Sequence, residues 1–242
     1  MSGLFYNLGK KVGPKVRKVT WVWQLMTGTE VDAIKMENEV GRDLACEIRN
    51  RLEVYSEPDT ERIFSDIGRC LFACVANRFR TFNFEAVRVS EPNAFALPGG
   101  FIFVTSSLFE LCQWNQDEVA FILAHEMGHV IRGHAMDRIM SNFAITTASR
   151  VAPVRGILAG WIKKVGIQYL ESAYSRELES QADKLGTLLT DAAGYNPRAS
   201  IELLQRLEKL KSLESGFNIG SYFSTHPPFE ERIRNIENLL RK

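Results

Sequence analysis

The chain has 242 residues, of which 45% are hydrophobic and 24% are charged, and its formal net charge is +1. This length and composition fit one large globular domain, or a domain with an extension, and leave ample chain for a core. A net charge so close to zero gives no electrostatic reason to expect a nucleic acid as a partner.

Residues 1–29 differ from the rest of the chain, because they contain no acidic residue but five lysines and arginines among aromatic and aliphatic side chains. The positive charges follow the first apolar residues, and no long apolar run with a small-residue cleavage site is present. The segment is therefore not predicted to be a secretory signal. It is expected to pack as a solvated arm against the domain of residues 30–242, and contact with an anionic membrane surface is the alternative.

The first part of the domain, residues 30–80, is predicted to be helical. One helix is expected from residue 30 to about residue 55, with Thr29 as its cap, because apolar residues recur there at helical spacing. A second helix is expected to begin at Pro58, since proline favours the first position of a helix.

The second part, residues 82–242, opens with a change from helical to alternating spacing. Apolar and polar residues alternate at first, which indicates a strand, and a phase shift at Ala86-Val87 reflects either a bulge or chance. Residues 93–97 and 101–104 flank Pro98-Gly99-Gly100, a pattern that is typical of two strands joined by a tight turn.

The rest of the chain is predicted to be helical, with breaks near residues 114–115, 138–170, 194–197 and 215–228. Residues 139–162 are fairly apolar, but two arginines and a proline interrupt them. A helix that spans a bilayer needs about 20 predominantly apolar residues, so no transmembrane helix is predicted. Core packing is the first interpretation of this stretch, and a flap or a segment in contact with a membrane surface are the alternatives.

The cysteines are Cys46, Cys70, Cys74 and Cys112. Cys70 and Cys74 share one helix face in an apolar context, and buried free thiols are expected because free cysteine commonly behaves as a small core residue. Free thiols are typical of a reducing compartment, so a cytoplasmic protein is predicted. Peripheral attachment to a membrane is the alternative.

The most informative stretch is His125-Glu126-Met127-Gly128-His129, which spells H-E-x-x-H inside an apolar, helical segment. At about 3.6 residues per turn, His125 and His129 lie one above the other on a helix and can reach a single metal ion. Glu126 can then reach a water molecule bound to that ion and act as its general base. Two neutral nitrogen ligands, an open coordination position and a carboxylate base are what a zinc hydrolase needs.

The alternative is a surface helix that carries two histidines and a glutamate by chance. The preceding residues 119–124 are apolar throughout, and the acidic turn at residues 116–118 favours a helix start there. Polar residues in so apolar a helix would be costly to bury unless something binds them. The context therefore favours a metal site.

Zinc needs a further protein ligand, and His134 is the first candidate along the chain. It lies one residue short of the position that a third histidine takes in metzincins. On a continuing helix its side chain would point roughly 140° away from His129. His134 is therefore predicted to be a solvent-side or helix-end residue rather than a ligand.

The better candidate is a carboxylate from a second helix, on which Glu179 and Asp183 share one face. With Glu179 as the ligand, Asp183 could accept a hydrogen bond from a ligating imidazole. Spacing alone leaves Glu171 and Glu177 as rivals and a solvated acidic face as the alternative.

The chain now resembles the gluzincin peptidases related to HtpX, the CAAX prenyl endopeptidases and the mitochondrial Oma-type peptidase. The resemblance covers about residues 84–242, in the family's order, and the shared motifs are together highly specific. They are A-H-E-M-G-H at 124–129, S-R-x-x-E-x-x-A-D at 175–183, N-A-F with P-G-G at 93–100, G-Y-N-P at 194–197, and S-T-H-P-P followed by E-R-I at 224–233.

The resemblance implies an α+β fold, in which a mostly helical gluzincin-type metallopeptidase domain has a small β-sheet whose edge strand lies beside the active-site helix. It implies that Glu179 is the third ligand of one Zn²⁺ ion per chain, together with His125 and His129. It also implies that the substrate binds as an added strand beside Asn93, Ala94 and Phe95, and an ordinary interior strand of the hairpin is the alternative for this segment.

Two further residues are candidates for the site. His226, in a loop that Pro227-Pro228 would hold rigid, is predicted to stabilise the oxyanion, and a loop or capping histidine is the alternative. Arg232 is expected to anchor an acidic group such as Asp183, although a surface ion pair fits the sequence equally well.

The sequence therefore predicts a zinc metalloendopeptidase that cleaves proteins or peptides. A zinc-binding chaperone-like or adaptor module without turnover is the alternative, and Glu126 argues against it because zinc binding alone does not require that carboxylate. A purely structural zinc site is disfavoured, since such sites usually have four protein ligands and often use cysteine. Without clear membrane spans, the chain resembles the soluble or peripheral members of the family.

Overall fold

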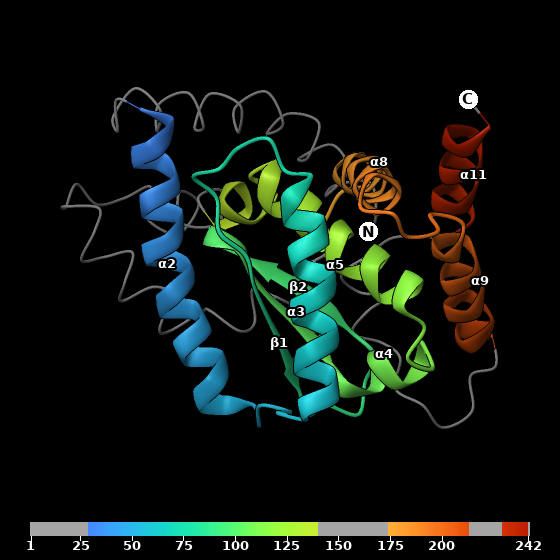
Figure 1. Ribbon diagram of the computed structural model, residues 1–242, viewed down its shortest axis with the longest axis horizontal. Helices are drawn as coiled ribbons and strands as arrows, with labels where there is room; N and C mark the ends of the chain where they lie inside the picture. Colours follow the sequence, from blue (N-terminus) through green and yellow to red (C-terminus); the bar gives the residue numbers. More distant parts are fainter. Residues whose placement is uncertain (1–28, 140–173, 213–228, 242) are drawn as a thin grey trace, which may run out of the picture.

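The computed structural model describes residues 29–139, 174–212 and 229–241 (Figure 1). In this part of the chain a three-stranded sheet lies between helix α2 (Glu30–Arg51) on one face and helices α3 (Pro58–Ala73) and α5 (Gln116–Ile131) on the other. The remaining helices are α4 (Ser106–Leu111), α8 (Arg176–Ala192), α9 (Ala199–Ser212) and α11 (Phe229–Leu240). The predicted α+β class, mostly helical with a small sheet, is confirmed.

The first two helices begin where the sequence predicted. The Thr29 side chain accepts a hydrogen bond from the Asp32 backbone N–H, and α3 has proline in its first turn. Helix α2 ends at Arg51 rather than near residue 55, because the chain after it turns extended and pairs with the sheet. Tyr55 donates its backbone N–H to the Ala86 carbonyl over 2.8 Å.

The sheet is mixed. Its strands are β1 (Asn83–Val87), β2 (Ala94–Leu97) and β3 (Phe101–Thr105), in the order β1-β3-β2. Strand β1 runs parallel to β3, whereas β2 runs antiparallel to it. Strand β2 is thus an edge strand within the described sheet, and it contacts α5, as the sequence predicted.

Both faces of the sheet are buried, which explains the shift in the apolar pattern of β1. Ala86 belongs to the core beneath α3 and α5, and Val87 belongs to a second core beneath α2. The register from Asn83 to Val87 against β3 is continuous, so the shift is not a bulge. Consecutive residues of a strand point to opposite faces, and here each face has its own core.

The turn between β2 and β3 needs both of its glycines. Gly99 and Gly100 have φ angles of 73° and 84°, a region that other residues rarely adopt. A Cβ atom on Gly99 would lie 2.6 Å from the Asn38 Cα atom of α2, and one on Gly100 would lie 1.9 Å from the Thr81 carbonyl oxygen. The turn can therefore pack this closely against α2 and the Thr81 carbonyl only with glycine at both positions.

Helices α5 and α8 make the most extensive contact between elements, and small residues bring their backbones together. A Cβ atom on Gly186 of α8 would lie 2.9 Å from the Cα atom of His125, and one on Gly128 of α5 would lie 3.1 Å from the Ala182 carbonyl oxygen. This close approach sets the distance between the side chains that the two helices direct at each other.

We expect Gly186→Ala to destabilise the protein by about 1–3 kcal/mol, because the added methyl group forces α8 away from α5. An exposed helical glycine would instead gain about 1 kcal/mol from the same change, so the sign is diagnostic. Urea denaturation measures it, with Lys184→Ala on the exposed face of α8 as a control expected within about 0.5 kcal/mol of wild type. A stabilised Gly186→Ala variant would contradict the packing.

The four cysteines are free thiols, as predicted, but Cys70 and Cys74 are only half-buried. The fully buried positions of α3 are taken by larger apolar residues such as Phe64 and Leu71, and Cys74, at the C-cap of the helix, packs only at the margin of the core. No helix among the described residues has both the length and the apolarity needed to cross a membrane. The predictions for residues 1–28, 140–162 and His226 fall outside the described residues.

Candidate metal centre

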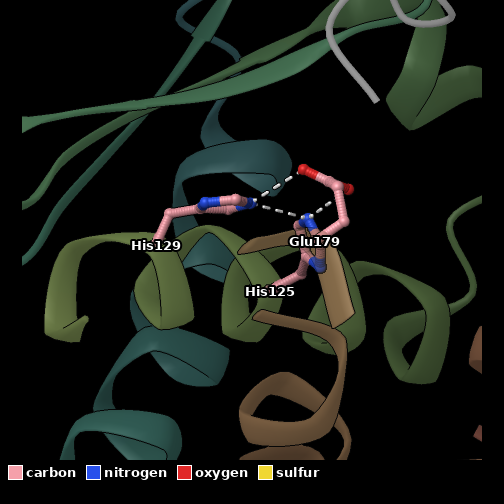
Figure 2. A group of neighbouring side chains, drawn as sticks. All are labelled: His125, His129 and Glu179. Atoms are coloured by element: carbon pink, nitrogen blue, oxygen red, sulfur yellow. Dashed lines mark hydrogen bonds and ion pairs between the residues drawn. The ribbon is translucent and has the colours of Figure 1, made fainter. Parts of the chain in front are cut away.

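Three side chains from two helices converge on one point (Figure 2). His125 and His129 rise from one face of α5, and Glu179 reaches them from the first turn of α8. The Nε2 atoms of the histidines are 3.2 Å apart. A carboxylate oxygen of Glu179 lies 3.2 Å from His129 Nε2, and the other lies 3.7 Å from His125 Nε2.

These separations fit a tetrahedral cation. Zinc–nitrogen and zinc–oxygen bonds are about 2.0–2.2 Å long, so two ligand atoms of a tetrahedral zinc ion lie about 3.3 Å apart. The three donor side chains are also deeply buried, with exposed fractions of 3% for His125, 0% for His129 and 1% for Glu179. Three such groups gathered away from water would be costly without a ligand, and a divalent cation meets that need.

The structure separates Glu179 from one of its two sequence rivals. Glu177 is exposed on the surface of α8, away from the two histidines, and Glu171 lies outside the described residues. Glu179 follows the cap residue Ser175, whose side chain accepts a hydrogen bond from the Leu178 backbone N–H and so begins the helix at this turn.

A network of charged side chains, Asp183 and Arg232, lies at the Nδ1 side of the His125 ring. Its Nδ1 atom is 3.0 Å from an oxygen of Asp183, and Arg232 of α11 donates two hydrogen bonds, of 2.7 and 2.8 Å, to the same carboxylate. Arg232 also lies 3.4 Å from Glu179. The sequence expected Arg232 near an acidic group of the site, and its exposed fraction of 4% excludes a surface ion pair.

The network determines which groups are charged. Burial alone would raise the pKa of Asp183, but Arg232 and His125 outweigh it and lower that pKa to about 2. Burial lowers the pKa of His125, and Asp183 and Glu179 more than offset this, so that the net shift is upward. Protons and a metal ion therefore compete for His125, and Asp183 remains an acceptor for its Nδ1–H.

We expect Arg232→Met to destabilise the protein by about 3–5 kcal/mol, because the change leaves the buried Asp183 carboxylate without its cation. Adding Asp183→Asn should recover part of the loss, since the buried charge is then gone. Urea denaturation of the single and double variants measures both effects. Arg234→Met, at an exposed position of the same helix, is the control, and equal stability of the two methionine variants would refute the role of the pair.

His134 is buried, with an exposed fraction of 3%, and its Nδ1 atom lies 3.1 Å from Nδ1 of His129. The helix-end part of the prediction holds, because His134 stands just beyond the end of α5, but the solvent-side part was wrong. It assumed a continuous helix, but α5 ends at Ile131 and Gly133 has a φ angle of 74°, after which residues 134–139 are helical again. The break turns His134 back toward the site, where burial lowers its pKa to about 4.

Tyr174 covers one face of the His129 ring, and no feature of its sequence neighbourhood indicated this role. The two rings are stacked with centroids 3.9 Å apart, and the Arg138 guanidinium lies 4.1 Å from the centroid of the Tyr174 ring. Burial raises the pKa of Tyr174 well above its ordinary value, with the charges of Glu126 and Glu179 adding to the shift. The hydroxyl therefore stays protonated beside two acidic groups.

Glu126 lies on α5 next to His125 and is 1% exposed. The residues of the predicted substrate strand lie nearby, at the edge of the sheet that contacts α5. Ala94 is buried, and Phe95 is half-buried and stacks on Phe103 with centroids 5.4 Å apart. Asn93 precedes the strand and is joined to Thr105 through its backbone.

Comparison with known proteins gives a family. The sequence pattern described as Peptidase family M48 matches residues 59–240, which is most of the chain. Mitochondrial metalloendopeptidase OMA1 of Schizosaccharomyces pombe is 31% identical over 207 residues, covering 85% of this chain and 60% of the relative. Metalloprotease YcaL of Escherichia coli is 29% identical over 163 residues, covering 65% of this chain and 62% of the relative.

Both relatives are longer than this chain, which spans about 60% of each. Among solved structures, the crystal structure of S. mikatae Ste24p has a TM-score of 0.46 and 16% sequence identity, covering 95% of this chain and 63% of that one.

Proposed function

This chain belongs to peptidase family M48, and from that premise we propose that it is a zinc-dependent metalloendopeptidase that hydrolyses internal peptide bonds of proteins or peptides. The observation that carries the proposal is the convergence of His125, His129 and Glu179 from two helices, with Glu126 beside them on α5. A family of peptidases and a buried, metal-sized cluster of donors point to the same chemistry.

Zinc is the metal that the donor set favours. Imidazole suits zinc among the common divalent ions, and two histidines with one carboxylate are a ligand set of catalytic zinc sites. Three protein ligands leave one coordination position for solvent or substrate, whereas structural zinc sites are usually closed by four. A bound zinc ion would supply Lewis-acid activation of the attacking water and of the peptide carbonyl.

Glu126 is the proposed general base. As a carboxylate it would accept the proton of the attacking water and then deliver it to the leaving nitrogen of the cleaved bond. Its place next to His125, on the helix that carries two of the ligands, supports this role.

The substrate would bind along β2 as an additional strand. The Asn93 carbonyl accepts the Thr105 backbone N–H, so the alternation of an antiparallel pair directs the backbone groups of Ala94 and Ala96 away from β3. An extended peptide could pair with those groups beside α5. Recognition through the backbone requires little of the substrate's side chains, which supports proteins and peptides as the substrate class.

His226 remains a prediction as the residue that stabilises the oxyanion, since it lies outside the described residues. The protonated Tyr174 hydroxyl and the Arg232 guanidinium are two buried donors near the ligand cluster. Of these, Arg232 already donates hydrogen bonds to Asp183 and forms an ion pair with Glu179.

Metal analysis paired with a proteolysis assay tests the proposal. The purified protein is expected to contain about one zinc ion per chain and to cleave casein. A chelator should abolish the cleavage and added zinc should restore it, while a serine-protease inhibitor should have no effect. Zinc binding without any cleavage would favour the chaperone-like or adaptor module instead, and a protein that binds no divalent metal would refute both functions.

A further inference from the structure

We propose that His134 is a positioning residue for the metal centre, whose Nδ1 atom accepts a hydrogen bond from Nδ1–H of His129 and thereby fixes the ring that presents Nε2 to the metal. This inference rests on the zinc site proposed above. It adds a residue that the H-E-x-x-H pattern does not contain and that lies beyond the helix carrying that pattern.

The geometry of the pair carries the inference. The two Nδ1 atoms are 3.1 Å apart, which is a hydrogen-bond distance, and both rings are buried. On the other side of the same ring, Nε2 of His129 faces His125 and Glu179 at 3.2 Å each. The His129 ring therefore points one nitrogen at the ligand cluster and the other at His134.

The protons of the pair can be arranged in only one way around a metal. A ligating Nε2 must offer its lone pair, so the hydrogen of the neutral His129 ring resides on Nδ1. That N–H needs an acceptor, and the Nδ1 atom of His134 must then be unprotonated. The hydrogen of His134 resides on its Nε2, and the side chain of Gln181 on α8 hydrogen-bonds the His134 ring as the partner.

This chain of hydrogen bonds joins the end of α5 to α8 only two residues from Glu179. It holds His129 relative to the helix that supplies the third ligand. The Tyr174 ring stacks on the His129 ring at a centroid distance of 3.9 Å and so also limits the rotation of the His129 side chain. Metal-ligating histidines usually need a partner at their second nitrogen, and such partners tune metal affinity.

The two ligands differ in the charge of that partner. His125 has the carboxylate Asp183, which two hydrogen bonds from Arg232 balance. His129 has a neutral imidazole. A second carboxylate beside His129 would add negative charge next to Glu179, and the neutral imidazole of His134 orients the ring without adding any.

A matched pair of variants of the full chain tests the inference, His134→Asn and His134→Leu. The two replacement side chains have nearly the same shape, and the amide oxygen of asparagine can lie near the place of Nδ1 and accept the hydrogen bond. We expect His134→Leu to bind zinc about 10–100-fold more weakly than wild type, measured by competition with a chromogenic chelator at fixed pH. His134→Asn should recover most of that affinity.

Equal affinities of the two variants, whether both like wild type or both weakened, would overturn the inference, because the acceptor would then have no effect. If His134→Leu does not fold, nitrogen-15 NMR of the histidines in the zinc-bound wild type decides. It should show His134 protonated at Nε2 only, and protonation at Nδ1 would overturn the hydrogen bond. A wild type that binds no zinc would refute the proposed function, and this inference with it.

Discussion

Glu126→Gln is expected to retain zinc and to lose peptide hydrolysis by about 10²–10⁴-fold, the range that a positioned general base contributes. Glutamine has nearly the same shape as glutamate, so the packing of α5 and the ligands His125 and His129 should be undisturbed. It cannot accept the proton of the attacking water. Zinc content by metal analysis and casein cleavage, measured on the same preparation, separate the two effects.

The matched control is Glu177→Gln, which makes the same chemical change at an exposed position in the first turn of α8. Its zinc content and its rate should both equal those of wild type. A Glu126→Gln variant that binds zinc normally and still cleaves casein at the wild-type rate would rule out the general-base role. That result would not contradict the proposed metal site, because zinc would still be bound.

Glu179→Ala is expected to lose both zinc and activity. Removing a residue that only supports a ligand typically costs about 10–100-fold in metal affinity, so removing a ligand should cost at least about 100-fold. The two histidines, one helical turn apart, would remain. The Arg232 guanidinium would still lie close by, but without the negative charge of Glu179. Repulsion from that cation should weaken the residual site further.

Competition with a chelator measures the loss, and Glu177→Ala, two positions earlier on the same helix, is the control. Because Glu177 is exposed, its removal should change neither zinc affinity nor casein cleavage. Wild-type zinc affinity in Glu179→Ala would remove this residue from the ligand set and return Glu171 to consideration.

Together the two glutamate variants distinguish the enzyme from the module without turnover. An enzyme loses hydrolysis in both variants but loses zinc only in Glu179→Ala. A zinc-binding module would show the same loss of zinc in Glu179→Ala, yet have no hydrolysis for Glu126→Gln to remove. The comparison therefore works even before a physiological substrate is identified.

Several features could be predicted from the sequence because short stretches of chain decide them. Thr29 and Pro58 start helices through contacts within one turn. The spacing of His125 and His129 places both on one face of α5 by the geometry of the helix alone. The Pro-Gly-Gly turn between two apolar runs indicates a hairpin for the same local reason.

The role of Glu179 was only partly predictable from the sequence. Its spacing from Asp183 showed that the two carboxylates share a face, but not that this face meets α5. Only the order of motifs shared with a peptidase family singled it out from Glu171 and Glu177. The contact between α5 and α8 depends on Gly186 and Ala182, whose small size has meaning only once the two helices are adjacent.

The helices, the strands, the turn and the pair of histidines follow from local sequence alone, because hydrogen bonds and side-chain spacing within a few residues set them. Four features became visible only in the folded domain: the strand order, the burial of both sheet faces, the place of Arg232 against Asp183 and the turn of His134 back toward His129. Each of these depends on contacts between residues far apart in the chain or on a break in a helix, and such contacts form only when the whole domain packs.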